Sequence, residues 1–142
     1  MHKGFTKDAL GTLTDFSIYF GHFLSDQVTC ARCGHTHQTH HEKMTDVNIA
    51  VEMMTDAFQD RFDVALLVSA GSDLVAPIRA IRQLFPRKRV VVAFPPARFS
   101  DALKHMSGKP LHLDVNLLSK AQFPERIRKP DGFEIIRPAK WR

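Results

Sequence analysis

Two cysteines and a group of histidines form the most reactive cluster in this sequence. Cys30 and Cys33 are separated by two residues, and four histidines follow within eight positions. The histidines are His35, His37, His40 and His41. Thiolate and imidazole suit Zn²⁺, and a zinc site with four protein ligands is structural rather than catalytic. We predict a zinc loop at residues 28–43, held by Cys30 and Cys33 and completed by His37 or His40. The alternatives are a reduced, metal-free loop with coincidental histidines, and cysteines that pair with those of another subunit.

Two aspartates stand where helices are expected to begin. Asp73 ends a turn of small residues that starts at Ser69, directly after an apolar run, and Asp46 opens an amphipathic segment. Sites in open α/β sheets gather outside the carboxyl ends of the strands. Carboxylates that converge there would suit Mg²⁺ or Mn²⁺, which prefer hard oxygen ligands. The alternative is that both aspartates are ordinary first-turn carboxylates of their helices.

Apolar patterning predicts strands and helices in alternation, which is typical of an α/β fold with a mainly parallel sheet. The expected strands are 15–23, 63–69, 90–94 and 111–113. The expected helices are 46–58, 74–84, 101–106 and 115–121, with N-caps at Thr45, at Ser72 or Asp73, and at Ser100. The polar segment 25–43 is expected to be a loop, and the proline-containing tail from Phe123 an extended wrap. The continuously apolar strand 63–69 should be covered on both faces.

Composition and charge narrow the function classes. Hydrophobic residues make up 44% and charged residues 25% of the 142 residues, which excludes wholesale disorder. No apolar run approaches the roughly 20 residues of a membrane helix, and no secretory signal is seen, so we expect a cytoplasmic protein with no membrane contact. Residues 1–78 carry a net charge of −5 (5 basic, 10 acidic), whereas residues 79–142 carry +10 (15 basic, 5 acidic).

The basic half contains a candidate RNA track, because phosphate contacts from Lys and Arg dominate nucleic-acid affinity. Its members are Arg79, Arg82, Arg87, Lys88 and Arg98, with Arg89, Lys104 and Lys109 beside them. The alternative is that these charges serve solubility.

Three blocks of the chain, residues 42–51, 66–78 and 89–103, resemble the NYN family of PIN-like, metal-dependent ribonuclease domains. The tail over 122–141 is similar to the family's bacterial branch. The resemblance implies a PIN-like three-layer sandwich, RNA as substrate, and Mg²⁺ or Mn²⁺ as cofactor. Asp46 and Asp73 match acids that hold the metal in the family, and Ser69 matches the serine that starts its Ser-Gly/Ala-Asp-Ser-Asp turn.

The sequence departs from the family pattern in two places. Gly71 occupies the position of the turn's first aspartate, and the family's opening strand with an Asp-Gly-x-Asn-like motif has no counterpart. We therefore expect a single, N-terminally truncated domain over residues 1–142 with weakened activity, completed by a homo-oligomer or a partner chain. The alternative function is a non-catalytic, zinc-stabilised protein-interaction module.

Overall fold

The computed structural model describes residues 3–139, with side chains from Phe5 onward, and these form two compact units. One unit comprises residues 19–114, and the other comprises 3–18 together with 115–139. Each is described by itself. The single domain expected over residues 1–142 stays a prediction.

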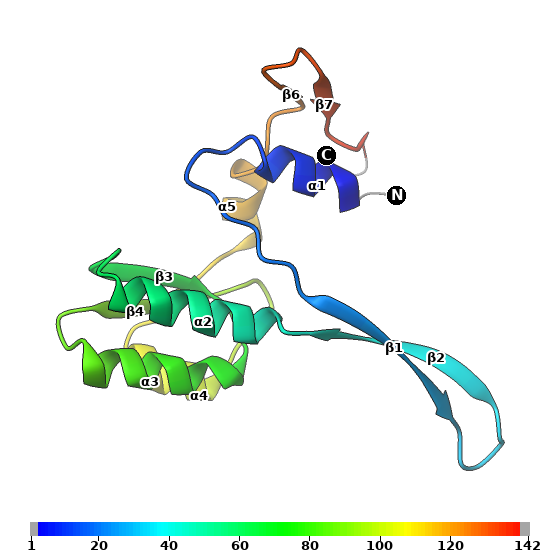
Figure 1. The fold of residues 1–142 in the computed structure, drawn as a ribbon, viewed down its shortest axis with the longest axis horizontal. Helices are drawn as coiled ribbons and strands as arrows, with labels where there is room; N and C mark the ends of the chain where they lie inside the picture. The colour runs from blue at the N-terminus through cyan, green and yellow to red at the C-terminus, as the bar shows by residue number, and fades with distance from the viewer. Residues whose placement is uncertain (1–2, 140–142) are drawn as a thin grey trace. The chain divides into compact units, whose positions relative to one another are not determined.

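A parallel sheet forms the centre of the 19–114 unit (Figure 1). Its strands, in the order β3-β4-β5, are β3 (Val64–Val68), β4 (Arg89–Phe94) and β5 (Leu111–His112). The helices are α2 (Thr45–Phe58), the short 3-10 helix η1 (Ser72–Leu74), α3 (Val75–Leu84) and α4 (Asp101–Ser107). The predicted α/β class is confirmed, and the arrangement is consistent with a PIN-like fold.

The core lies between the sheet and one layer of helices. Its fully buried large side chains are Phe94, Leu74, Ile78, Ile81, Leu103 and Val92. Apolar residues three or four positions apart place one face of each helix in this core, as the periodicity predicts. Figure 1 shows α2, α3 and α4 on the same side of β3 and β4.

The other face of β3 is open within this unit. Leu67 is buried, whereas Val64, Leu66 and Val68 are 48%, 59% and 49% exposed. The prediction that this strand is covered on both faces is therefore wrong for the 19–114 unit, because its helices pack against only one side of the sheet.

The segment before α2 is a long antiparallel hairpin. Strands β1 (His22–Thr29) and β2 (Thr36–Lys43) pair over eight residues each, from His22 opposite Lys43 to Thr29 opposite Thr36. The strand expected at 15–23 and the loop expected at 25–43 are thus both wrong. Residues 16–20 are not part of a strand in the described structure, whereas the polar segment closes on itself through backbone hydrogen bonds.

Helix starts follow the predictions only in part. Met44, with φ of 76°, precedes α2 in place of Thr45, which is already helical, and no side chain caps this end. Gly71 precedes η1, again without a side-chain cap, so neither Ser72 nor Asp73 has the predicted role. The cap at Ser100 is confirmed, because its hydroxyl accepts a hydrogen bond from the Leu103 N–H at 3.4 Å.

The second unit contains α1 (Lys3–Leu10), α5 (Val115–Lys120), β6 (Arg126–Arg128) and β7 (Glu134–Ile136). The tail is not the extended wrap expected from its prolines, because β6 and β7 pair as an antiparallel hairpin. Its turn is built by Asp131, whose carboxylate accepts the Phe133 N–H at 2.9 Å, and by Gly132 at φ of 85°. Over residues 3–139, no helix has the length and apolar character needed to cross a bilayer.

Candidate functional site

The parallel sheet gathers three loops at one edge, called here the carboxyl edge. They are the turn 69–73 after β3, the loop 95–100 after β4 and residues 113–114 after β5. Backbone hydrogen bonds join the start of two of these segments to the end of β4. Ser69 N–H donates to Ala93 O at 3.2 Å, and Leu113 N–H donates to Phe94 O at 2.9 Å. Residues from distant parts of the sequence therefore meet here.

The turn 69–73 is fixed by its own side chains. The Ser69 hydroxyl accepts the Gly71 N–H at 3.0 Å, and the Leu74 N–H donates to Gly71 O at 3.3 Å. Leu74 is fully buried and anchors the turn in the core, whereas Asp73 is exposed. Ser69 thus shapes the turn, and the Asp73 carboxylate stands free to meet solvent or a ligand.

Asp46 comes to this turn from α2. Its half-buried carboxylate lies so close to Gly71 that a β-carbon added there would stand 3.0 Å from Asp46 Oδ2. Helix α2 also contacts η1, in which Asp73 lies. The structure therefore brings Asp46, which was matched to the acid at the start of its helix, beside Gly71 of the turn that also contains Ser69 and Asp73.

The carboxyl edge has the type of donor atom that a divalent cation prefers, but it has too few donor side chains. Asp46 and Asp73 offer the hard oxygen donors that Mg²⁺ and Mn²⁺ prefer. Within residues 3–139, however, no three His, Cys, Asp or Glu side chains are grouped closely enough to hold a metal ion. Gly71 adds no donor, although its φ of −74° and ψ of 118° would accept any residue.

An aromatic cluster that the sequence analysis did not single out lies at the same edge. The Phe99 and His112 rings are 6.4 Å apart and nearly parallel, at 9°, and both contact the Phe94 ring. Lys104 Nζ is 5.7 Å from the centre of the Phe99 ring. Both Phe99 and His112 are exposed, and α4, which carries Lys104, contacts η1. The sequence offered one signal for this cluster: Phe99 follows the predicted strand 90–94, and His112 lies in the next predicted strand, 111–113.

The predicted RNA track is divided between separate surfaces. Arg98 lies on the carboxyl-edge loop, whereas Arg79 and Arg82 lie exposed on α3. Arg87 precedes the amino end of β4 and is exposed, but its neighbour Lys88 is 8% exposed and donates to Asp60 and, at 2.7 Å, to Phe62 O. The structure therefore brings only Arg98 of these five residues to the carboxyl edge.

A second basic surface lies near the amino end of β4. Arg82, Arg89 and Lys109 line a hollow of about 420 Å³ there. The basic residues of this half of the chain thus form at least two groups, at opposite ends of the strands.

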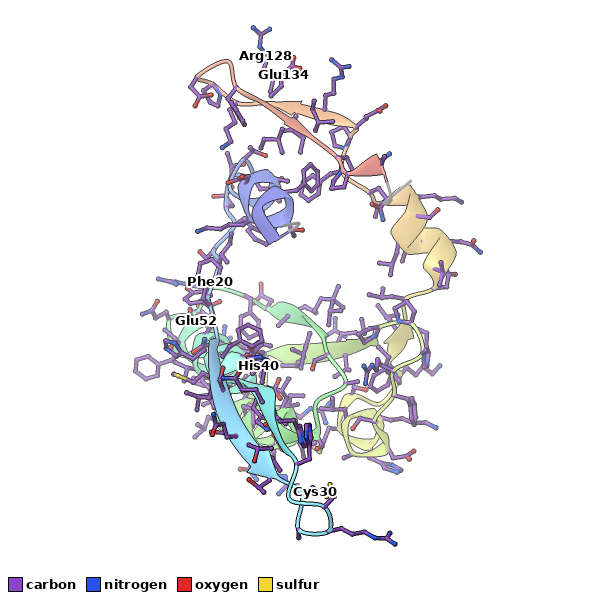
Figure 2. All side chains as sticks on the ribbon, turned by 90° about the vertical axis from the view of Figure 1, so that its right-hand side faces the viewer. Phe20, Cys30, His40, Glu52, Arg128 and Glu134 are labelled. Atoms are coloured by element: carbon purple, nitrogen blue, oxygen red, sulfur yellow. The ribbon has the colours of Figure 1, made fainter. Side chains whose placement is uncertain are left out.

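The cysteines lie at the turn of the β1–β2 hairpin, where both are exposed. Backbone N–H groups of Arg32 and Cys33 donate to Cys30 Sγ and lower the pKa of the Cys30 thiol from its ordinary value. Figure 2 shows Cys30 at the hairpin turn and His40 further along β2, where His40 Nδ1 is 2.9 Å from Ser25 Oγ. His37 is opposite Val28. The structure places His40 away from the cysteines.

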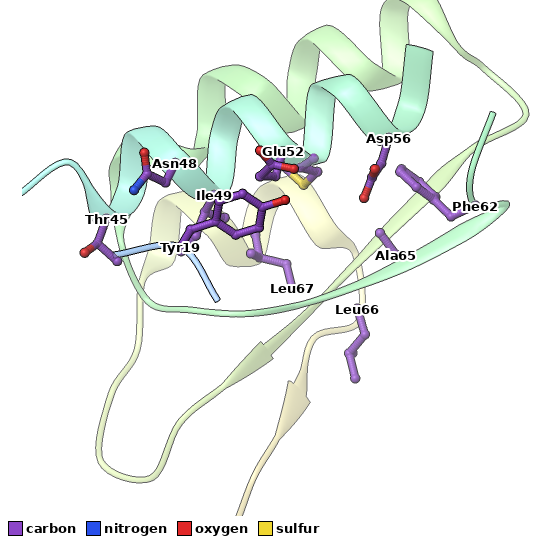
Figure 3. A pocket seen from close by; sticks show the side chains of 11 residues that line it. Tyr19, Thr45, Asn48, Ile49, Glu52, Asp56, Phe62, Ala65, Leu66 and Leu67 are labelled. Carbon is purple, nitrogen blue, oxygen red and sulfur yellow. The ribbon is translucent and has the colours of Figure 1, made fainter. Parts of the chain in front are cut away.

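A further cavity, of about 360 Å³, lies along α2 beside β3 (Figure 3). Tyr19, Ile49 and Leu66 give it an apolar lining, and Glu52 and Asp56 add carboxylates. Asp56 is held by Arg61 at 3.2 Å. None of the predicted site residues lines this cavity.

Comparison with known proteins gives one family. The model of the NYN domain matches residues 11–114. No curated protein matches the chain. Among solved structures, the chain is similar to a protein of unknown function from Vibrio parahaemolyticus, with 25% identity and a TM-score of 0.44. That similarity covers 50% of this chain and 42% of the Vibrio protein, so the chain spans less than half of that relative.

Proposed function

Because this chain belongs to the NYN domain family, whose members are nuclease-like, we propose that it binds single-stranded RNA along the carboxyl edge and cleaves it weakly, as a metal-dependent endoribonuclease short of acidic ligands. The observation that carries the proposal is the approach of the Asp46 carboxylate to Gly71, which joins the acid of α2 to the turn that ends in Asp73.

Single-stranded RNA suits the other groups at this edge. Exposed aromatic rings stack on nucleobases of any sequence, and each such contact contributes about 1–3 kcal/mol. Phe99 and His112 offer two such rings, and Arg98 and Lys104 lie close by to contact phosphates. In a duplex the bases are paired and stacked, so these rings would find no exposed base face.

Weak cleavage is expected because the acids are few. A divalent cation, when bound, would lower the pKa of a coordinated water and so supply the nucleophile for attack on the phosphodiester. Mg²⁺ demands near-octahedral coordination, and Asp46 and Asp73 supply only carboxylate oxygens from two side chains. The role of the protein is then to position the RNA backbone against these acids.

A binding experiment tests the RNA surface. Anisotropy of a labelled single-stranded RNA is measured with the double variants Arg98→Ala/Lys104→Ala and Arg82→Ala/Arg89→Ala. The first pair lies at the carboxyl edge and should lose about tenfold in affinity, with a salt slope lower by roughly 0.7 for each lost phosphate contact. The second pair removes the same charge at the other end of the strands. A larger loss in the second variant, or equal affinity for duplex RNA, would contradict the proposal.

A cleavage experiment tests the acids. We expect slow, Mn²⁺-stimulated cleavage that Asp46→Asn and Asp73→Asn each abolish, whereas Asp63→Asn, at the amino end of β3, leaves it unchanged. Vigorous Mg²⁺-dependent cleavage that survives both Asp46→Asn and Asp73→Asn would place the catalytic centre elsewhere.

The second candidate function is a non-catalytic, zinc-stabilised protein-interaction module. The observation that favours it is the hairpin with no buried residue in its strands and with two exposed cysteines at its turn. This function predicts zinc binding without any affinity for RNA, so the anisotropy experiment separates the two.

A further inference from the structure

The turn of the β1–β2 hairpin has a closed backbone that carries both cysteines. Cys30 N–H donates to His35 O and Gly34 N–H donates to Cys30 O, both at 2.9 Å, which closes the turn. Gly34 adopts φ of 70°, a conformation that a side chain would strain. Cys30 and Cys33 both lie in this turn, and both are exposed. The two sulfur ligands are thus placed together before any metal arrives.

A single chain does not complete a zinc site with these thiols. Structural zinc takes four ligands, and the described residues contain no group of three suitable side chains. His40 is three residues beyond His37 on β2, roughly 10 Å away at the rise of a strand, and on the opposite face. The His35 and His37 rings lie parallel to each other, with centres 6.5 Å apart. Residues 3–139 therefore supply two sulfur ligands at this turn and group no further ligand with them.

The hairpin itself shows where the missing ligands can come from. Both of its faces are open: every residue of β1 is exposed, and only Thr39 of β2 is half-buried. A two-stranded hairpin on its own is marginally stable in water. Alternation along β1 places Leu24 and Val28, which are 52% and 43% exposed, on the same face as Cys30, with Asp26 between them. A second, identical hairpin would cover these two apolar side chains and bring two more thiolates to the same place.

We propose that one zinc ion binds between two copies of this chain, held by Cys30 and Cys33 of each. Four thiolates in a tetrahedron are an established donor set for structural Zn²⁺. The interface is isologous, so each chain contributes the same residues. Arg32, which is exposed between the two cysteines, places a positive charge at each turn that offsets the negative charge of four thiolates. This proposal stands apart from the RNA site, because it uses none of the carboxyl-edge residues.

Metal titration of the reduced, full-length chain tests it. Zn²⁺ binding is measured by competition with a chromophoric chelator, and Co²⁺ binding by the absorption of tetrahedral cobalt thiolate. Saturation is expected at about one metal ion per two chains, with a sulfur-only cobalt spectrum. Sedimentation equilibrium should show that the metal doubles the mass and that a chelator reverses this. The metal-free Cys30→Ser/Cys33→Ser variant, measured in parallel, gives the association that does not depend on the metal.

Histidine variants separate a shared site from one completed within a chain. Cys30→Ser and Cys33→Ser should each abolish metal binding, whereas His35→Ala/His37→Ala and His40→Ala should retain it at the same ratio. One metal ion per chain with unchanged mass, or loss of binding in a histidine variant, would overturn the proposal. Failure of the reduced thiols to bind either metal would also overturn it. Circular dichroism of each variant establishes that the fold is intact.

Discussion

The Asp46 carboxylate lies beside Gly71: a β-carbon built at position 71 would be 3.0 Å from Asp46 Oδ2 and 3.3 Å from Oδ1. The backbone of Gly71 is extended, with φ of −74°, so an L-residue would fit its conformation. Position 71 is therefore the place where one substitution could add a carboxylate beside Asp46 with only a shift of a few tenths of an ångström.

Gly71→Asp should make stability depend on a divalent cation. Without metal, two neighbouring carboxylates repel each other, and the variant should be less stable than Gly71→Asn by up to about 1 kcal/mol at pH 7. With millimolar Mn²⁺ the order should reverse, because the cation gains a further oxygen ligand. Thermal melts of both variants with and without Mn²⁺ measure this. An equal response of the two variants would show that no metal binds at the turn. A rise in RNA cleavage for Gly71→Asp alone would show that Gly71 limits activity.

Lys88 should matter to the fold rather than to RNA. It is 8% exposed, and its ammonium donates to Phe62 O and to the exposed Asp60 carboxylate. Lys88→Ala leaves the Phe62 carbonyl without this donor, so we expect a loss of roughly 1–3 kcal/mol in unfolding free energy. Arg87→Ala, at the exposed neighbouring position, should change stability by less than about 0.5 kcal/mol. Urea unfolding measures both, and equal losses would contradict this account.

The Asp60–Lys88 pair should also give a pH dependence. The hydrogen bond and charge of Lys88 hold the pKa of Asp60 below its ordinary value. A lowered native pKa means that the stabilisation is complete above the unfolded pKa of about 3.9 and is lost as pH falls through the native pKa. Asp60→Asn should therefore be less stable than the unsubstituted chain at pH 7, and the difference should shrink as pH falls through the native pKa. A difference that persists at acid pH would assign it to packing.

Phe99 and His112 should contribute to RNA affinity through stacking. Phe99→Ala is expected to weaken binding of single-stranded RNA by about tenfold, and Phe99→Tyr to retain it, because a stacked base contributes about 1–3 kcal/mol. Phe58→Ala is the matched control, since Phe58 is 80% exposed at the end of α2 and lies outside the aromatic cluster. Fluorescence anisotropy measures all three. Equal losses for Phe99→Ala and Phe58→Ala would remove the stacking surface from the RNA site.

The open face of β3 should drive association that needs no metal. Leu66 is 59% exposed in the middle of this strand, so Leu66→Lys should lower self-association with little change in melting temperature. Leu84→Lys, at a 64% exposed position ending α3, is the control. Sedimentation velocity at micromolar concentration, in the presence of a chelator, measures both. A chain that is already monomeric under these conditions would contradict the prediction.

The elements predicted most accurately from the sequence are those whose apolar side chains are buried in the core. Strands β3 and β4 and helix α2 carry apolar residues in patterns that the core requires, and their positions were predicted to within one or two residues. The β1–β2 hairpin was missed because neither of its faces is buried, so its sequence has no alternation to detect. Residues 16–20 have the aromatic and β-branched composition of a strand, but composition within one segment does not determine whether that segment joins a sheet.

The candidate site shows the same division. Asp46, Ser69 and Asp73 could be named from their place in the sequence, but the approach of Asp46 to Gly71 depends on how the start of α2 packs against the turn 69–73. Lys88 was grouped with its basic neighbours because composition does not distinguish an exposed lysine from one enclosed by Phe62 and Asp60. The stacking of Phe99 on His112 depends on the parallel pairing that aligns the ends of β4 and β5, which the sequence alone does not specify.

The absence of a buried side chain in β1 and β2 has a kinetic consequence. The amides of this hairpin are protected only by their own hydrogen bonds, so they should exchange with deuterium through local fraying, at rates independent of global stability. The amides of β4, in which Val92 and Phe94 are fully buried, should exchange only when the whole unit opens. The protein should therefore show two separate classes of amide exchange rate. A ligand that orders the hairpin should slow the fast exchange of the hairpin amides and leave the slow exchange of the β4 amides unchanged.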